Sequence, residues 1–372
     1  MKPSFSKRQL EDFSMYEEHV QRLIEHIPNG GCAVDLQELF FKLTMDVSTD
    51  HLFGSSCLSL APSSELSPGP DLGRSLDRAQ RAAVMKFALG SFDKLRPQPQ
   101  YWADTKRVRQ YADSYIHNTL GRVRQSNQDP GNPSESSMEL SCMESPRRTN
   151  VPYSFAKQSD SLEEIRAGLL HLLVGGRDTT AALLSNLFLS LAQSPRVWRK
   201  LRTEVAALDG AKPDATTLKQ MRYLRQCMDE SLRCHPPIPW TVRTAAQDTV
   251  LPTGGGEDQQ SPILVEEGTL LLVPLYCLHR HPDFWGADAD EFVPERWNSV
   301  KPGYAYLPFS AGTRKCLGWE FALNTAAYAV IRLVQHFPKL EEADSRPWAE
   351  ELGLSMTSTN GVRVILRRAD SA

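Results

Sequence analysis

The chain contains 372 residues, of which 41% are hydrophobic and 23% charged, so it has enough apolar material to bury a large core. Its 42 Lys and Arg residues nearly balance 45 Asp and Glu residues, and a net charge of −3 gives no support to nucleic-acid binding. Seven cysteines without a C-x-x-C pair indicate reduced thiols rather than disulfides, and no run reaches the ~18 apolar residues of a membrane span.

Two segments are predicted to be flexible surface insertions within one unit that spans residues 1–372. The first, at about residues 55–73, is rich in Ser and Pro. The second, at about residues 125–150, is rich in Ser, Pro, Asn and Glu. Such compositions do not supply the apolar surface that a packed element needs. We find no internal repeat in the sequence.

The longest helical pattern runs from about residue 162 to residue 192. Ser161 and Glu164 form a capping-box pattern at its start, and Pro195 lies just past its end. Gly175 and Gly176 interrupt its middle, where each glycine costs about 1 kcal/mol relative to alanine. Either close packing against another helix or room for a ligand would explain this pair.

A second helical pattern covers residues 224–232 and holds Glu230 and Arg233 at i, i+3. Taken alone, this pair indicates only a weak surface ion pair. Further on, the triple glycine at residues 254–256 predicts a hairpin loop. The alternating run at residues 269–281 predicts a strand, so Cys277 and its neighbouring histidines are not interpreted as a zinc site.

Cys316 stands in the run FSAGTRKCLG, residues 309–318, ahead of an apolar helical pattern that reaches residue 337. A thiol at a helix N-terminus is favoured as a thiolate by the helix dipole, and Arg314 and Lys315 add positive charge. Gly312 and Gly318 allow tight bends and the close approach of a flat group. The alternative is an inert buried cysteine.

This run resembles the F-x-x-G-x-R-x-C-x-G haem-binding signature of the cytochrome P-450 superfamily. The resemblance implies a mixed, mainly α fold with small β-sheets, and haem b with Cys316 as its axial thiolate ligand. It also implies that Phe309 packs near the sulfur side of the haem. Arg314 and Arg243 would contact haem propionates.

Two further motifs match the same superfamily. The run ESLR, followed by FVPERW, implies that Glu230, Arg233 and Arg296 form a buried structural lock behind the haem. The run GGRDTT implies that the long helix crosses the distal face of the haem, where Asp178 and Thr179 would act as an acid and alcohol pair that relays protons. Arg177 receives no chemical role.

Positions relative to these motifs imply which side chains line the substrate pocket, although core packing explains each of them equally well. They are Leu173, Gly175, Gly176, Trp240, Val242 and Thr357.

The resemblance implies a monooxygenase that inserts one oxygen atom from O2 into a C–H bond, with electrons from an NADPH-dependent flavoprotein reductase. The runs DVSTDHLFG and LPTGGGEDQQSPI are similar to fungal members that hydroxylate n-alkanes and fatty acids, so an alkane, a fatty acid or a polyketide-derived metabolite is the expected substrate class. The alternatives are a non-catalytic remnant with weak or no haem binding, and a haem-thiolate isomerase or dehydratase.

The similarity begins near Lys2, at the part of the family pattern that follows its third major helix. We therefore expect the family's N-terminal anchor, first strands and first three major helices to be absent from this intracellular chain, and haem binding by the 372 residues to be weak. Family members are anchored in the endoplasmic reticulum membrane.

Overall fold

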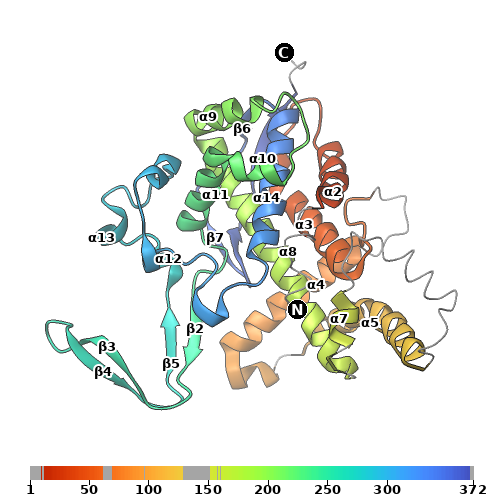
Figure 1. Ribbon diagram of the computed structural model, residues 1–372, viewed down its shortest axis with the longest axis vertical. Coiled ribbons are helices and arrows are strands. Elements are labelled where there is room, and N and C mark those ends of the chain that lie inside the picture. Colours follow the sequence, from red (N-terminus) through yellow and green to blue (C-terminus); the bar gives the residue numbers. More distant parts are fainter. Residues whose placement is uncertain are drawn as a thin grey trace.

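The computed structural model describes residue 10 and residues 12–61, 69–95, 97–128, 151–156, 158–159 and 161–368. Most of the described residues are helical, and the strands form small antiparallel sheets (Figure 1). The expected mixed, mainly α fold with small sheets is therefore confirmed. Within the described residues, none of the helices combines the length and the apolar character that crossing a membrane would require.

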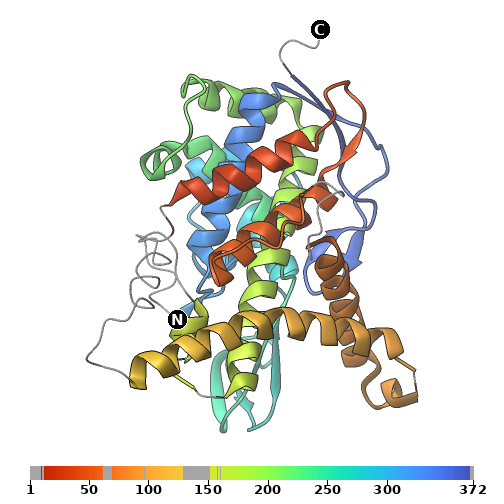
Figure 2. The same cartoon turned by 90° about the vertical axis from the view of Figure 1, so that its right-hand side faces the viewer.

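Helix α8 (Leu162–Gln193) is the central element of the fold. Figure 2 shows it running lengthwise through the molecule, while α2 (Phe13–Glu25), α3 (Leu36–Phe53) and α5 (Pro99–Gln128) cross it. The hydroxyl of Ser161 caps the helix by accepting a hydrogen bond from the backbone N–H of Glu164. The Glu164 carboxylate accepts from Ser159 instead of completing the expected reciprocal box. The sequence predicted a helix at residues 162–192, and the observed helix ends one residue later, at Gln193.

The buried apolar residues form two clusters that α8 joins. The larger cluster collects side chains from α2, α3 and α8 with those of α9 (Pro195–Ala206), α11 (Arg222–Cys234) and α14 (Trp319–His336). The smaller cluster lies between α3, α8 and α5, together with α4 (Gly69–Leu89) and α7 (Val151–Ala156). Nearly every residue of α8 from 180 to 192 is buried, which explains why its second half is apolar around most of its circumference.

The strands in the described part of the chain pair antiparallel. The three-stranded sheet has the order β1 (Val34–Asp35), β9 (Arg363–Arg367) and β6 (Lys339–Glu342). The two-stranded pairs are β2 (Thr241–Thr244) with β5 (Leu270–Val273), β3 (Thr249–Gly255) with β4 (Ser261–Val265), and β7 (Glu350–Leu352) with β8 (Met356–Ser358). The β3 and β4 hairpin projects from the body (Figure 1), and Gly254 and Gly256 in its turn region adopt positive φ.

Short helices connect these larger elements. They are η2 (Gly90–Leu95), α10 (Ala215–Gln220), α12 (Leu275–Leu278), α13 (Pro282–Trp285), η3 (Pro294–Asn298), η4 (Gly303–Ala305) and η5 (Gly312–Arg314). The run at residues 269–281 was expected to be one strand. It forms β5 and then turns at Pro274 into α12, because proline cannot continue the strand pairing.

Parts of the two segments that were expected to be insertions are buried or helical. Cys57 and Leu60 are each 1% exposed, and residues 69–73 belong to α4. The Asp46 carboxylate holds the segment after α3 by accepting from the backbone N–H groups of Ser59 and Leu60. Residues 62–68 and 129–150 lie outside the described part, and residues 125–128 end α5.

Candidate haem-thiolate site

The loop that holds Cys316 is folded back on itself just before α14. The backbone N–H of Cys316 donates to the carbonyl of Phe309 at 2.8 Å, and the N–H of Lys315 donates to Gly312 at 3.2 Å. Gly312 has φ +67°, a conformation that glycine adopts without the steric cost of a side chain. Ser310 has φ +60°, which is uncommon for a residue with a Cβ. This local geometry places the Cys316 side chain in the wall of a cavity.

The surroundings of the Cys316 thiol differ from the expectation. The N-cap of α14 is Gly318, so Cys316 lies two residues before the N-cap rather than in the first turn of the helix. Enclosure by the chain raises the pKa of the thiol above its ordinary value, although the residue is exposed toward the cavity. The Gly318 backbone and the charge of Lys315 act in the opposite direction. Lys315 itself stacks over Trp319, with its Nζ 4.3 Å from the ring centroid.

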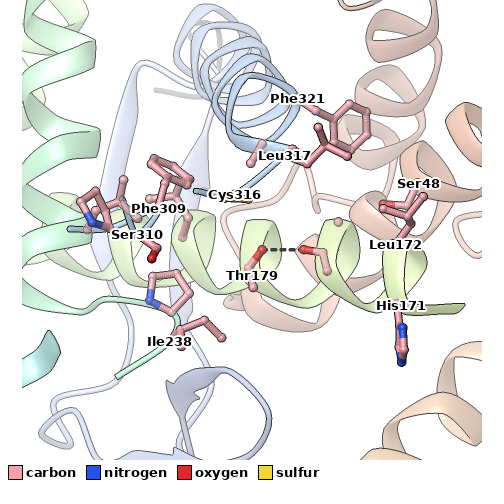
Figure 3. A pocket seen from close by; sticks show the side chains of 18 of the residues that line it. Ser48, His171, Leu172, Thr179, Ile238, Phe309, Ser310, Cys316, Leu317 and Phe321 are labelled. Atoms are coloured by element: carbon pink, nitrogen blue, oxygen red, sulfur yellow. Dashed lines mark hydrogen bonds between the residues drawn. The ribbon is translucent and has the colours of Figure 1, made fainter. Parts of the chain in front are cut away.

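A cavity of about 310 Å³ separates this loop from the middle of α8. In Figure 3 the segment with Phe309, Ser310 and Cys316 lies across from the turn of α8 that holds Thr179. The walls are largely apolar, with Ile238, Leu275, Leu317, Phe321, Ala322 and Leu183 among the lining residues.

The two glycines of α8 serve different purposes. A Cβ at Gly175 would meet nothing within 4 Å, so this position opens into the cavity. A Cβ at Gly176 would come within 3.0 Å of the Ser48 hydroxyl on α3 and 3.6 Å of the Phe321 ring. Gly176 therefore allows close helix packing, while Gly175 leaves room for a ligand.

Thr179 and Asp178 lie at different pockets beside α8. Thr179 lines the cavity, and its hydroxyl donates to the Gly175 carbonyl at 2.7 Å (Figure 3). Asp178 is 3% exposed and lies instead at a second pocket of about 330 Å³, which also involves α3, α4 and the segment around β7 and β8. Adjacent residues of a helix differ by about 100° in direction, and at this turn Thr179 is on the cavity side whereas Asp178 is turned toward the second pocket. The expected acid and alcohol pair is thus divided by the helix.

Arg177, to which the sequence assigned no role, holds Asp178 in this position. Its Nη1 donates to Asp178 at 2.8 Å and also to Asp77 on α4, and its guanidinium lies 4.8 Å from the centroid of the Phe41 ring. Burial lowers the pKa of Arg177, but the two carboxylates outweigh it and keep the pKa above its ordinary value. Burial raises the pKa of Asp178, and Arg177 opposes that rise. No signal in the sequence near Arg177 indicated Asp77, which lies 100 residues away.

The structure brings Glu230, Arg233 and Arg296 together in a buried cluster. Arg233 binds both carboxylate oxygens of Glu230 at 3.0 Å, and the Arg296 Nε lies 3.3 Å from the same carboxylate. The Trp297 indole and the backbone N–H of Val293 also donate to Glu230. Remaining donors of Arg233 bind the carbonyls of His279, Ala289 and Glu291.

His279 connects this cluster to the cysteine loop. It is fully buried, and its Nε2 lies 2.9 Å from the backbone N–H of Leu307, which donates to it. Burial lowers the pKa of His279 to about 4, which keeps the ring neutral and able to accept this bond. Cys277, two residues earlier, is exposed. His279 is a supporting residue of the loop that the sequence alone did not indicate.

Arg314 lines the cavity from η5, and Arg243 lies on β2. The Nη2 of Arg243 lies 3.3 Å from the Ser310 hydroxyl, so Arg243 reaches the cysteine loop although it does not line the cavity. Both arginines are exposed. Gly318 lies in the cavity wall as well.

Four of the expected pocket residues lie elsewhere. Leu173 is fully buried in the smaller core cluster, because Leu172 rather than Leu173 is on the cavity face of α8. Trp240 and Val242 are 43% and 36% exposed and do not line the cavity, whereas Ile238 and Thr241 do. Thr357 is buried at the second pocket, beside Ser355.

A soft sulfur ligand facing an open stretch of helix, with arginines at the edge, fits a flat iron cofactor. Fold and site together therefore define a haem-thiolate protein. The family model for cytochrome P450 matches residues 4–363, and the chain belongs to the cytochrome P450 family. Haem with cysteine ligation is the cofactor general to this family.

Several curated relatives are similar over nearly the whole chain. The cytochrome P450 monooxygenase fsdH of Fusarium heterosporum is 37% identical over 373 residues, which is 100% of this chain and 65% of the relative. The cytochrome P450 monooxygenase himC of Aspergillus japonicus is 36% identical over 99% of the chain and 65% of its own length. Cytochrome P450 52A13 of Debaryomyces hansenii is 36% identical over 98% of this chain and 71% of its own length. The chain thus spans slightly less than two thirds of the first two relatives.

Proposed function

We propose that this chain forms the haem-binding catalytic unit, over residues 1–372, of a monooxygenase that inserts one oxygen atom from O2 into a C–H bond of an apolar substrate. The observation that carries the proposal is the placement of the Cys316 thiol across a largely apolar cavity from Gly175 and Thr179. An NADPH-dependent flavoprotein reductase is the proposed electron donor, and a membrane of the endoplasmic reticulum is the proposed location.

In this proposal the cavity wall formed by the Cys316 loop and α8 would hold the haem. The Cys316 thiolate would bind its iron, Phe309 would pack beside the sulfur, and Gly312 and Gly318 would allow the loop to approach the group closely. Arg314 and Arg243 are the candidate partners of the propionates, since both are exposed cations beside the loop. When bound, haem supplies the activation of O2 that side chains cannot provide.

The side chains of α8 contribute a proton donor and determine the shape of one cavity wall. The Thr179 hydroxyl is on the cavity side and is therefore the proposed group that passes a proton toward the reacting oxygen. Asp178 can join it only after its side chain leaves Arg177, which costs a buried, charge-assisted hydrogen bond. The open space at Gly175 and the apolar walls favour an alkane, a fatty acid or a polyketide-derived metabolite as substrate.

Replacement of the ligand tests the proposal directly. Cys316→Ala should abolish the thiolate-type difference spectrum that carbon monoxide gives with the reduced, haem-loaded protein. Cys277→Ala is the matched control, because Cys277 is also exposed but does not line the cavity. A thiolate-type spectrum that survives in Cys316→Ala would refute the proposed ligand and with it the proposed function.

A further inference from the structure

One histidine in the cavity wall, His171 on α8, has no part in the proposed chemistry. It lies four residues before Gly175 and eight before Thr179, and all three line the cavity. Since an α-helix rises about 1.5 Å per residue, His171 is about 12 Å along α8 from Thr179. Figure 3 shows it on the far side of Thr179 from Phe309 and Ser310. His171 thus lies at the end of the cavity remote from this part of the cysteine loop.

The ring of His171 is available to a ligand. The residue is exposed, and within the described part of the chain its ring nitrogens have no hydrogen-bond or ion-pair partner. A second histidine in the wall, His51 on α3, is 8% exposed and its ring lies against Phe321, with the centroids 4.7 Å apart. Arg314 lies on the cysteine loop, where it is already the proposed partner of a haem propionate. Among these three basic side chains, His171 is therefore the one that a substrate can use.

The contrast between this imidazole and its surroundings indicates an amphiphilic ligand. The cavity wall is largely apolar, so an alkyl chain that binds along it releases water from both surfaces. An imidazole N–H donates to carboxylate oxygens, and a hydrogen bond to an ionised acceptor is stronger than one between neutral groups. An alkane gains nothing from such a donor. We propose that His171 is a specificity-determining residue that binds the carboxylate of a long-chain carboxylic acid.

This role of His171 rests on the proposed function and narrows it. Among the proposed substrates, His171 favours a fatty acid over an alkane of equal length. With the carboxylate at His171, the alkyl chain follows the apolar wall past Gly175 toward Thr179 and Cys316. Binding in the opposite direction, with the carboxylate at Arg314, would set the acid against a haem propionate for the same guanidinium. The two directions therefore make different residues responsible for recognising the acid.

Calorimetric titration of the haem-loaded full chain with dodecanoate and with methyl dodecanoate tests the proposal. The ester keeps the alkyl chain of the acid but lacks its negative charge. His171→Leu should weaken dodecanoate binding roughly fivefold or more and leave ester binding within about twofold of the wild type. His171→Gln, which keeps an N–H donor, should retain most of the affinity for the acid. His117→Leu is the matched control and should change neither affinity, because His117 is exposed but does not line the cavity.

Three results would overturn the role of His171. Unchanged dodecanoate binding in His171→Leu would show that the acid is held elsewhere, and Arg314→Gln would then weaken it instead. Equal weakening of acid and ester would show that His171 only shapes the cavity. A wild-type chain that binds the acid no more tightly than the ester would show that the carboxylate is not recognised. Loss of the thiolate-type carbon monoxide spectrum in the wild-type chain would instead count against the proposed function, because the calorimetric comparison does not depend on that spectrum.

Discussion

At the scale of single residues, Thr179 is the side chain whose chemistry is easiest to separate from folding. Its hydroxyl bonds only the Gly175 carbonyl, which is already part of the helical ladder, so its removal should not disturb α8. We expect Thr179→Ala to bind haem normally and to release several-fold more hydrogen peroxide per electron consumed.

Thr203→Ala is the matched control for this change, because Thr203 makes the same kind of bond to Arg199 on the remote helix α9. Both variants should give the haem absorbance of the wild type. Product yield per electron in Thr179→Ala equal to that of the wild type would remove Thr179 from the reaction.

His279 makes stability depend on pH. Its pKa is about 4 in the folded chain because of burial, against an ordinary value of 6.5, so protons bind the unfolded chain preferentially. Stability is therefore complete above pH 6.5 and falls as the pH drops toward 4, by about 3 kcal/mol in total from this residue.

Urea unfolding at pH 7 and pH 5 measures this effect. Between pH 7 and pH 5 the wild type should lose about 2 kcal/mol of stability through His279. His279→Gln, whose side chain can still accept from Leu307, should not show this loss. His281→Gln, an exposed neighbour, should retain the wild-type difference. Equal pH dependence in wild type and His279→Gln would contradict the assignment.

At the scale of elements, Glu230 joins α11 to η3 and to the segment before it. Its carboxylate is the shared acceptor of Arg233, Arg296 and Trp297, so Glu230→Ala leaves the fully buried Arg233 without its counter-ion, while Arg296 keeps only the half-exposed Asp288. Removing one partner of such a buried cluster costs about 3–5 kcal/mol. We expect a lower urea midpoint and protein that fails to retain haem.

Asp288→Ala offers a comparison, because Asp288 also binds Arg296 but is half exposed. A surface contact of this kind contributes at most about 1 kcal/mol. If Glu230→Ala and Asp288→Ala reduced the midpoint equally, the cluster around Glu230 would not have the structural importance that its burial indicates.

The sequence predicted α8 and its glycine pair but not the direction of each side chain around the helix. Periodicity defines a face only to within about one residue, and for this reason both Leu172 and Leu173 were expected at the cavity, where only Leu172 of the two lies. The orientation of Asp178 depends on Arg177 and on Asp77 from α4, a contact over 100 residues that local pattern does not encode. The bonds of Glu230 were predictable because its partners come from recognisable motifs.

At the scale of the whole molecule, the mainly helical fold with small sheets followed from the motif resemblance, whereas the pocket lining depended on how distant segments meet. The segment after α11 was expected to line the cavity with Trp240, Thr241 and Val242; Thr241 does so together with Ile238, whereas Trp240 and Val242 do not. Thr357 lies at the second pocket because β8 packs beside α8 on its other side.

The cavity as a whole predicts the polarity of the substrate. Its apolar walls should bind long apolar molecules by releasing water from both surfaces. In haem-loaded protein, a fatty acid or an alkane of about twelve carbons should shift the haem absorbance, and Leu183→Asp, in the lining of α8, should weaken that shift at least tenfold. A shift with compact polar compounds alone would contradict an apolar substrate.

The hydrogen bond from Cys316 to Phe309 closes the loop into a ring of fixed size, with a smaller closure between Lys315 and Gly312 inside it. Both hydrogen bonds join backbone atoms, so they depend on the number of residues in the loop and not on the side chains. Exposed positions such as Thr313 can therefore change their side chains freely, but an insertion or deletion between residues 309 and 316 would move the sulfur out of the wall. Over evolutionary time, we expect exposed positions of this stretch such as Thr313 to vary in residue type while the length of the stretch stays constant.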